Sequence, residues 1–401
     1  KNLDEGENNS MRCRAGPQRH LLLWASVSSI QAFAFVPPRR RIWMNNASKK
    51  RAAEVLPPPT STFSLTASSS SEKTSFGEAA AAEEKTSKDY YFDSYAHFGI
   101  HEEMLKDEVR TRAYMNAIEE NKHLFEGKVV LDIGCGTGIL SMFAARAGAK
   151  QVIGIECSSI IEQAQQIVDA NGFTEKITLV KGRVEEVEIP VEKVDIIISE
   201  WMGYFLLYES MLDSVIFARD KWLVPGGMLL PDKAVLHVCA IEDEAYKAEK
   251  IDFWDDVYGF DMSVIKEIAI TEPLVDLVHE NAVVTTCEPI LALDLLTCSK
   301  EDCDFKSSFK LIATRDDTAH ALVAYFDCAF SQLDTPVAFS TSPFQRYTHW
   351  KQTVFYLKQP LALRAGEAVV GNLGCSRNAK NPRDLDIEVD VRGAVQSYRL
   401  R

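Results

Sequence analysis

Two acidic side chains on one short aromatic segment are the residues in this sequence best suited to chemistry. Glu200 follows the apolar run 194–198, and Glu209 comes nine residues later, after a segment with one glycine. The run is rich in β-branched residues, which indicates a buried parallel strand, and ligands bind where such strands end. Two carboxylates in an apolar site repel each other unless a cation hydrogen-bonds to both. Guanidinium fits such a pair best, because its planar fork binds carboxylate bidentately. The alternative is two solvated glutamates in a loop.

A glycine-rich turn follows an earlier apolar strand. From Asp132 the sequence reads Asp-x-Gly-x-Gly-x-Gly, including Gly134 and Gly136, and leads into a helix expected over 140–149. Glycine allows a tight turn and close approach of a ligand to the backbone. The acidic Asp132 would repel the phosphates of a dinucleotide but suits S-adenosylmethionine (AdoMet), which has an ammonium, a sulfonium and no phosphate. Glu156 ends the next strand 20 residues after Gly136, near the spacing at which an acid holds ribose hydroxyls.

The following segments complete one sheet. A third strand is expected at 177–180, and Glu185 just beyond it is placed to bind the adenine amino group. A helix at 211–223 leads to a Pro-Gly-Gly turn and a closing apolar strand. Strand, helix and strand in alternation favour right-handed crossovers and a parallel sheet. We therefore predict an α/β, Rossmann-like, AdoMet-binding methyltransferase domain over 89–231.

Beyond this domain the pattern changes to short alternating strands, which predicts an antiparallel barrel or sandwich over 232–401. An insertion at about 243–278 has too many aromatic residues for a solvated loop, so we expect it to bury them on a partner, most simply in a homodimer. His349, in the segment Thr-His-Trp, could be a structural histidine or part of a site. The short alternating strands of this second domain are expected at 235–239, 309–313, 321–326, 350–355, 368–370 and 385–391.

The first 88 residues are predicted to be a disordered tail, because their Pro-, Ser- and Ala-rich composition cannot bury enough apolar surface. If translation starts at Met11, segment 11–41 resembles a targeting signal with a basic front and an apolar stretch, which would send the protein to an organelle. We predict residence in the nucleus and cytoplasm, with the organelle as the alternative if this segment is a real signal. No other stretch is long enough to span a membrane.

Charge and cysteine content exclude some functions. The formal net charge is −14, and the tail is net basic, so the acidic excess belongs to the folded part. An acidic body argues against direct nucleic-acid binding and is compatible either with attraction of basic partners or with ordinary solubility charge. The nine cysteines show neither CxxC pairs nor zinc spacing, so we expect reduced thiols in an intracellular protein and no metal.

With these segments assembled, residues 89–401 resemble the protein arginine methyltransferases, most closely those of type I. The double-glutamate segment and the Thr-His-Trp segment are highly specific to that family, whereas the tail has no counterpart. The matching motifs are Tyr91-Phe92-x-Ser94-Tyr95, Ile100-His101-x-x-Met104-Leu105-x-Asp107, Val130-Leu131-Asp132-x-Gly134-x-Gly136-Thr137-Gly138, Glu200-Trp201-Met202-Gly203-Tyr204 to Glu209-Ser210-Met211, and Thr348-His349-Trp350.

The resemblance implies a role for each matching position. Glu200 and Glu209 would hold the substrate guanidinium, and His349 would pair with Asp107. Tyr91, Phe92 and Tyr95 would lie on a helix that closes over the cofactor. The AdoMet site, which would release S-adenosylhomocysteine, would also be lined by His101, Arg110, Asp132, Gly134, Gly136, Glu156 and Glu185, with Arg110 on the cofactor carboxylate.

The resemblance also implies a product and an assembly. Met104 and Met211 would flank the target nitrogen in the type I pattern, which gives monomethyl- and asymmetric dimethylarginine, in substrates such as histones and Gly-Arg-rich proteins. The insertion would dock on the cofactor domain of a second subunit. The proton released on transfer could go to Glu209 or to the His349–Asp107 pair. Two other functions stay open: an AdoMet enzyme with a small-molecule acceptor, and a non-enzymatic scaffold.

Overall fold

The computed structural model describes residues 95–401, which lie in the compact unit Lys85–Arg401. The predicted tail 1–88, its segment 11–41, and Tyr91 and Phe92 lie outside the described residues. Among the described residues, the helices α2 (Phe98–Lys106), α3 (Glu108–Glu119) and α4 (Lys122–Phe125) precede the first strand.

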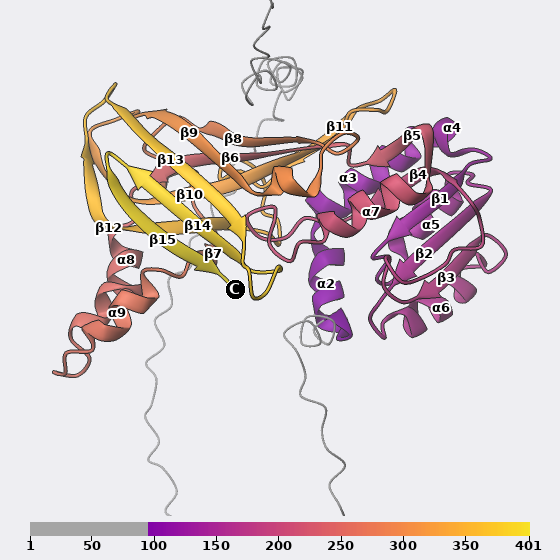
Figure 1. Cartoon of the computed structure of the whole chain (residues 1–401), viewed down its shortest axis with the longest axis horizontal. Helices are drawn as coiled ribbons and strands as arrows, with labels where there is room; N and C mark the ends of the chain where they lie inside the picture. The colour runs from indigo at the N-terminus through magenta and orange to yellow at the C-terminus, as the bar shows by residue number, and fades with distance from the viewer. Residues whose placement is uncertain (1–94) are drawn as a thin grey trace, which may run out of the picture. The chain divides into compact units, whose positions relative to one another are not determined.

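A five-stranded parallel sheet forms the first domain, as predicted (Figure 1). Its strand order is β3-β2-β1-β4-β5, so the order reverses between β1 and β4. Ligands of open α/β sheets bind at such a reversal, which puts the glycine turn after β1 and Glu200 after β4 at one point. The elements are β1 (Val129–Ile133), α5 (Ile139–Arg146), β2 (Gln151–Glu156), α6 (Ile161–Ala170), β3 (Ile177–Lys181), β4 (Val194–Ser199), α7 (Leu212–Trp222) and β5 (Leu223–Leu230).

The expected Pro-Gly-Gly turn lies inside β5 rather than before it. Val194 of β4 pairs with Leu223, but Ile196 pairs with Met228, so the intervening residues bulge out of the ladder. Gly226 has a φ of 76°, which a side chain would strain. The strand therefore begins earlier than its apolar pattern indicates.

The second domain is antiparallel throughout its strand pairs, which confirms the predicted class. Hydrogen bonds divide it into a six-stranded sheet, with path β7-β12-β10-β6-β8 and β11 on β10, and a four-stranded sheet, β15-β14-β13-β9. The strands are β6 (Lys233–Ile241), β7 (Leu274–Asp276), β8 (Glu288–Asp294), β9 (Phe305–Ile312), β10 (Asp317–Phe330), β11 (Val337–Ser340), β12 (Gln352–Leu363), β13 (Ala368–Arg377), β14 (Leu385–Val391) and β15 (Ala394–Leu400).

The insertion folds into short helices that expose apolar side chains. It contains α8 (Glu244–Lys250), η4 (Asp252–Asp255) and α9 (Ser263–Ala269), drawn below β12 in Figure 1, and it returns to the sheet as β7. Tyr258 is 97% exposed and Val264 78%. The remaining short helices are η5 (Glu280–Ala282) and η6 (Lys300–Cys303).

The apolar core is continuous across both domains. One cluster includes buried side chains of the parallel sheet and of both antiparallel sheets. Polar contacts cross the same boundary: Trp350 Nε1 donates to the carbonyl of Met202 at 2.7 Å. A second, smaller core, which we call the arm-side core, joins β6, β10 and β12 to the insertion and includes Ile251 and Ile270. None of the described helices combines the length and apolar character that crossing a bilayer requires.

Asn121 connects the two domains and gives a test of this packing. It is fully buried, its amide donates to the carbonyls of Ala117 and Thr335, and its oxygen accepts from the Thr335 amide. Asn121→Ala should lower the free energy of unfolding by about 1–3 kcal/mol, because it leaves buried backbone groups unpaired. Urea denaturation measures the change.

Asn171 provides the matched control. Its amide also donates to a carbonyl four residues earlier, that of Ile167, but it is exposed. Asn171→Ala should change stability by no more than about 0.5 kcal/mol. Equal effects of the two substitutions would contradict the bridging role of Asn121.

Candidate active site

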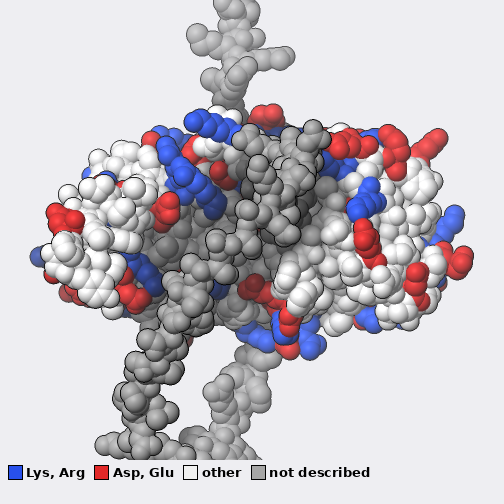
Figure 2. Space-filling view, turned by 90° about the horizontal axis from the view of Figure 1, so that it is seen from below, with Lys and Arg blue, Asp and Glu red and all other residues white. Residues whose placement is uncertain are grey.

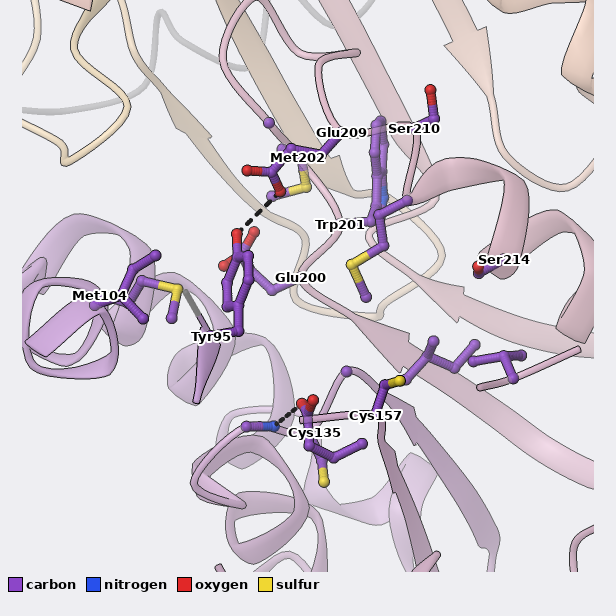
Figure 3. A pocket seen from close by; sticks show the side chains of 18 of the residues that line it. Tyr95, Met104, Cys135, Cys157, Glu200, Trp201, Met202, Glu209, Ser210 and Ser214 are labelled. Atoms are coloured by element: carbon purple, nitrogen blue, oxygen red, sulfur yellow. Dashed lines mark hydrogen bonds between the residues drawn. The ribbon is translucent and has the colours of Figure 1, made fainter. Parts of the chain in front are cut away.

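One large cavity, of about 850 Å³, opens at the strand-order reversal. Both domains line it: the parallel sheet contributes the ends of β1 and β4, and the antiparallel domain contributes His349 and the segment 380–383. Figure 3 shows part of its wall. Twelve of the predicted site residues line the cavity: Tyr95, His101, Met104, Arg110, Gly134, Gly136, Glu156, Glu185, Glu200, Glu209, Met211 and His349.

The glycine turn is enclosed by two side chains. At Gly134, whose φ is 69°, an added Cβ would lie 2.4 Å from Cε of Met211. At Gly136, whose φ is 53°, it would lie 3.2 Å from the His101 ring. The turn therefore needs glycine both for its backbone conformation and for space. It brings bare backbone to the cavity wall, as a bound nucleoside would require.

Glu156 is fixed at the end of β2. One carboxylate oxygen accepts from the Gly136 amide at 3.0 Å and the other from the Ser158 amide at 2.8 Å. Further along the wall, Glu185 accepts from the Ser214 hydroxyl at 2.5 Å. Both acids are held as hydrogen-bond acceptors before a ligand binds. Glu156 lies at the end of β2 and Glu185 just past β3, the positions at which the sequence analysis predicted contacts to the ribose and the adenine.

Asp132 does not reach the cavity wall, contrary to the expectation that it lines the AdoMet site. It is fully buried behind the glycine turn, where Oδ2 accepts from the Ser141 hydroxyl at 2.6 Å and Oδ1 has no hydrogen-bond partner. Burial raises the pKa of Asp132 to about 6, against the opposing effect of the Ser141 bond. The carboxylate of Asp132 thus connects the strand before the glycine turn to Ser141 on α5. No sequence motif indicated this contact.

Glu200 is already paired with a guanidinium. Arg110 Nε donates to Glu200 Oε2 at 2.9 Å, and the two side chains are only 7% and 9% exposed. A buried carboxylate without a cation would be costly, so the pair with Arg110 offsets the burial of Glu200. The family resemblance implies that Arg110 binds the cofactor carboxylate. In the structure Arg110 instead pairs with Glu200, the first of the two glutamates, within the same cavity.

Glu209 is fixed by side chain and backbone. Tyr95 donates its hydroxyl to Glu209 Oε2 at 2.9 Å, the contact drawn as a dashed line in Figure 3. The Glu209 backbone has a φ of 75°, unusual for a non-glycine residue. Arg383 holds this conformation: its carbonyl accepts from the Glu209 amide at 2.9 Å, and its Nη1 donates to the Glu209 carbonyl at 2.9 Å.

The segment 378–384, between β13 and β14, is a part of the site that sequence reasoning missed. Asn378 accepts from two amides of its own turn, and Asn381 donates to Asp384 at 2.8 Å. These Asx contacts stiffen the segment that carries Arg383. A cluster of Asn, Pro and Asp is typical of a turn, but the contact of this turn with Glu209 spans 174 residues and has no local signal.

Asp107 lies just outside the cavity and positions His349. Asp107 Oδ2 is 2.8 Å from His349 Nδ1 and accepts from the His349 amide at 2.8 Å, while Oδ1 caps α3 through the Arg110 amide. Burial acts to raise the pKa of Asp107, but the bonds from His349 and Arg110 outweigh it and the pKa is lowered. An anionic Asp107 holds a proton on Nδ1, which leaves Nε2 of His349 able to accept one.

Two methionines lie near the acids. Met104, on α2, is drawn beside Tyr95 and Glu200 in Figure 3, and Met211 precedes α7 next to the glycine turn. Both line the cavity. The thioether chains are flexible and apolar, so they shape the space around a reacting group without hydrogen-bonding it.

Gly203 tests whether the double-glutamate segment needs its observed path. An added Cβ would lie 2.1 Å from the Tyr208 carbonyl oxygen, so alanine must displace the segment. Gly203→Ala should reduce turnover at the two glutamates by about 100-fold or more, because small displacements of a positioned group are that costly. Binding of AdoMet, measured by calorimetry, should fall much less than turnover, since the Gly136–Glu156 contact of the glycine turn is not displaced.

Gly374 in β13 is the matched control, since an added Cβ there makes only ordinary contacts, 3.6 Å or more away. Gly374→Ala should retain activity. A Gly203→Ala protein as active as the unchanged one would show that the path of this segment is unimportant.

Comparisons with known proteins match both domains in order. Residues 130–227 match a model described as a methyltransferase domain, and residues 232–395 match the arginine methyltransferase oligomerization subdomain. Protein arginine N-methyltransferase 1 of Chlamydomonas reinhardtii is 60% identical over 324 residues, covering 79% of this chain and 94% of that protein. The Dictyostelium discoideum protein of the same name is 60% identical over 305 residues, covering 76% and 89%.

Solved structures agree with these relatives. The Trypanosoma brucei PRMT1 enzyme–prozyme heterotetrameric complex with AdoHcy has a TM-score of 0.75 at 50% identity, covering 77% of this chain and all of that chain. Arabidopsis thaliana protein arginine methyltransferase 10, in an open conformation, has a TM-score of 0.68 at 31% identity, covering 78% and 100%. With an AdoMet-type cavity joined to two glutamates and relatives that match over three quarters of its length, this chain belongs to the protein arginine methyltransferase family.

Proposed function

We propose that this protein transfers methyl groups from AdoMet to guanidinium nitrogens of arginine in proteins, giving monomethyl- and asymmetric dimethylarginine. The observation that carries the proposal is the Arg110–Glu200 pair, facing the same cavity as Glu209. It supports the view that Glu200 accepts a guanidinium. Family membership and the cavity beside the glycine turn support AdoMet as the methyl donor.

The two glutamates prepare the acceptor. Free arginine is protonated at cellular pH and its charge is delocalised, so it is a poor nucleophile. Glu200 and Glu209 would bind two nitrogens and draw the positive charge toward them, leaving electron density on the third. AdoMet, when bound, supplies a methyl group on a sulfonium. Holding that methyl in line with the nitrogen accounts for up to about 7–11 kcal/mol of the barrier.

Arg110 connects the two ligands. AdoMet carries a carboxylate, and a guanidinium that leaves Glu200 for this group would exchange one charge-assisted pair for another. The first glutamate would then be open to the substrate. This exchange reconciles the observed Arg110–Glu200 contact with the role that the family resemblance implies for Arg110.

The proton released from the methylated nitrogen has two acceptors in reach of the cavity. His349 offers Nε2, with Nδ1 held by the anionic Asp107 at 2.8 Å. Glu209 offers a carboxylate, of which one oxygen already accepts from Tyr95. Whether the proton goes to His349 or to Glu209, the groups that stabilise the charge of the transition state are already held in position before the substrate binds.

The proposed substrates are basic proteins such as histones and Gly-Arg-rich proteins, met in the nucleus and cytoplasm. On the face drawn in Figure 2, acidic and basic side chains of the described residues are interspersed rather than gathered in one patch. Selection of basic substrates would therefore rest on the acidic groups at the cavity more than on long-range steering toward this face. Met104 and Met211 would leave room for a second methyl on the same nitrogen.

The proposed assembly is a homodimer formed through the insertion. The antiparallel domain matches an oligomerization subdomain, and the Trypanosoma structure is a heterotetramer. The exposed apolar side chains of the insertion form a surface that water disfavours, which supports a partner there. They are Phe253, Tyr258, Phe260, Met262, Val264, Ile265, Ile268 and Leu277.

Glu200→Gln tests the function directly. The purified protein should methylate a Gly-Arg-rich peptide, and mass spectrometry should find monomethyl- and asymmetric dimethylarginine. The variant should lose about 100-fold or more in turnover, because an amide cannot pair with the guanidinium charge. Its affinity for AdoMet should stay within about threefold. Loss of AdoMet binding instead, or a wholly symmetric product, would contradict the assignment.

Charge on the insertion tests the dimer. Phe260→Glu together with Val264→Glu should give a monomer in analytical ultracentrifugation, with at least about tenfold lower activity, because two carboxylates would be buried in the interface. Val395 on β15 is also exposed, at 61%, but lies outside the insertion. Val395→Glu should leave the dimer intact. A fully active monomer would reject the proposal.

A further inference from the structure

Two cysteines lie opposite each other at the edge of the arm-side core. In the ladder between β6 and β8, His237 pairs with Pro289 and Val238 with Glu288. The same antiparallel register, continued by one residue, places Cys239 opposite Cys287. Cys239 is fully buried, whereas Cys287 is half-buried. One thiol is thus open to small reagents, and the second lies directly behind it.

Polar side chains surround this pair on the neighbouring strand. Tyr325 of β10 is the ladder partner of His237, and their rings stack with centroids 5.0 Å apart and planes 10° apart. His237 Nε2 also lies 3.1 Å from Asp327 Oδ2. These groups are remote from the cavity wall, and the methyl-transfer mechanism uses none of them.

The surroundings favour a thiolate at Cys287. Its sulfur is approached first by the Cys239 thiol and also by the Tyr325 hydroxyl and the His237 ring, which together lower the pKa of Cys287 to about 6 against the effect of burial. The same contact and burial raise the pKa of Cys239. Of the two sulfurs, the buried one therefore holds its proton more strongly. A thiolate with a neighbouring thiol is the arrangement of a peroxide-sensitive cysteine.

We propose that Cys239 and Cys287 form a reversible disulfide, with Cys287 as the cysteine that hydrogen peroxide attacks and Cys239 as the resolving thiol. The Cys287 thiolate, hydrogen peroxide and a proton give a sulfenic acid and water. The Cys239 thiol then displaces the sulfenic oxygen as a second water, forming the S–S bond. Two electrons pass from the sulfurs to the peroxide. A dithiol reductant reverses the reaction.

The backbone accommodates the bond without rearrangement. Directly opposed residues of antiparallel strands have Cα atoms about 4.5–5.5 Å apart, within the 4.4–6.8 Å range of disulfides. The bond would enclose the whole insertion, 243–278, in one covalent loop, because the two cysteines flank it in the chain. It would tie β6, which leads into the insertion, to the start of β8.

Cys298 and Cys303 offer a matched comparison within the same domain. They also neighbour each other, at η6, and each is 6% exposed. Burial raises their pKa values to about 11 and about 12. Two cysteines close in space but kept as thiols should resist the oxidant that links Cys239 to Cys287.

Peptide mapping of the full chain after hydrogen peroxide treatment tests the proposal. The expected product is a peptide pair joined through Cys239 and Cys287, lost on addition of dithiothreitol and absent from Cys287→Ser. No link should join Cys298 to Cys303. A chain that carries sulfinic acid at Cys287 with no such link, or a link from Cys287 to another cysteine, would overturn the pairing.

Alkylation by iodoacetamide provides a second test that does not depend on oxidation. At pH 7, Cys287 should react about tenfold or more faster than Cys298 and Cys303, since its larger thiolate fraction outweighs its lower nucleophilicity. Its rate should fall as pH drops through about 6, its pKa in the fold. Cys239→Ser, which keeps only a hydroxyl opposite, should move that midpoint upward. Equal rates for all three cysteines would overturn the proposal.

Discussion

A buried carboxylate needs a cation, and much of this structure follows from meeting that need at Glu200. The side chain sits at the end of β4, nearly out of water, and Arg110 on α3 supplies the charge. Asp107 caps the helix that carries Arg110 and at the same time holds His349 of the antiparallel domain. The position of one acid is thus coupled to a helix start, a domain contact and the orientation of an imidazole.

The sequence predicts those parts of the fold that have a local physical cause. The apolar runs before the glycine turn and before Glu200 are buried strands because both faces of a parallel sheet are covered. The domain order, the antiparallel second half and the exposed aromatic insertion follow from periodicity and composition in the same way. The family resemblance added roles for residues, such as His349, whose surroundings cannot be inferred from neighbours in the chain.

Contacts between distant segments account for what sequence reasoning missed. β8 carries a proline and acidic residues, and β15 buries few side chains, so neither shows a clear strand pattern. Asp132 precedes the glycine turn, yet its carboxylate is bound by Ser141 on α5 and does not line the cavity. Arg383 supports Glu209 through its own carbonyl and its guanidinium, both bound to backbone groups of Glu209 174 residues away, so neither local sequence indicates the contact.

The position of Arg383 has a consequence for how such a protein can change during evolution. The glycine turn and both glutamates are encoded before residue 231, but the left-handed backbone at Glu209 is held by a turn encoded more than a hundred residues later. Recombination at the domain boundary would combine Glu209 with a turn from another protein, which need not hold its left-handed backbone. The two halves must therefore be inherited together, and new acceptor preferences would arise more readily by substitution around the cavity than by exchange of whole domains.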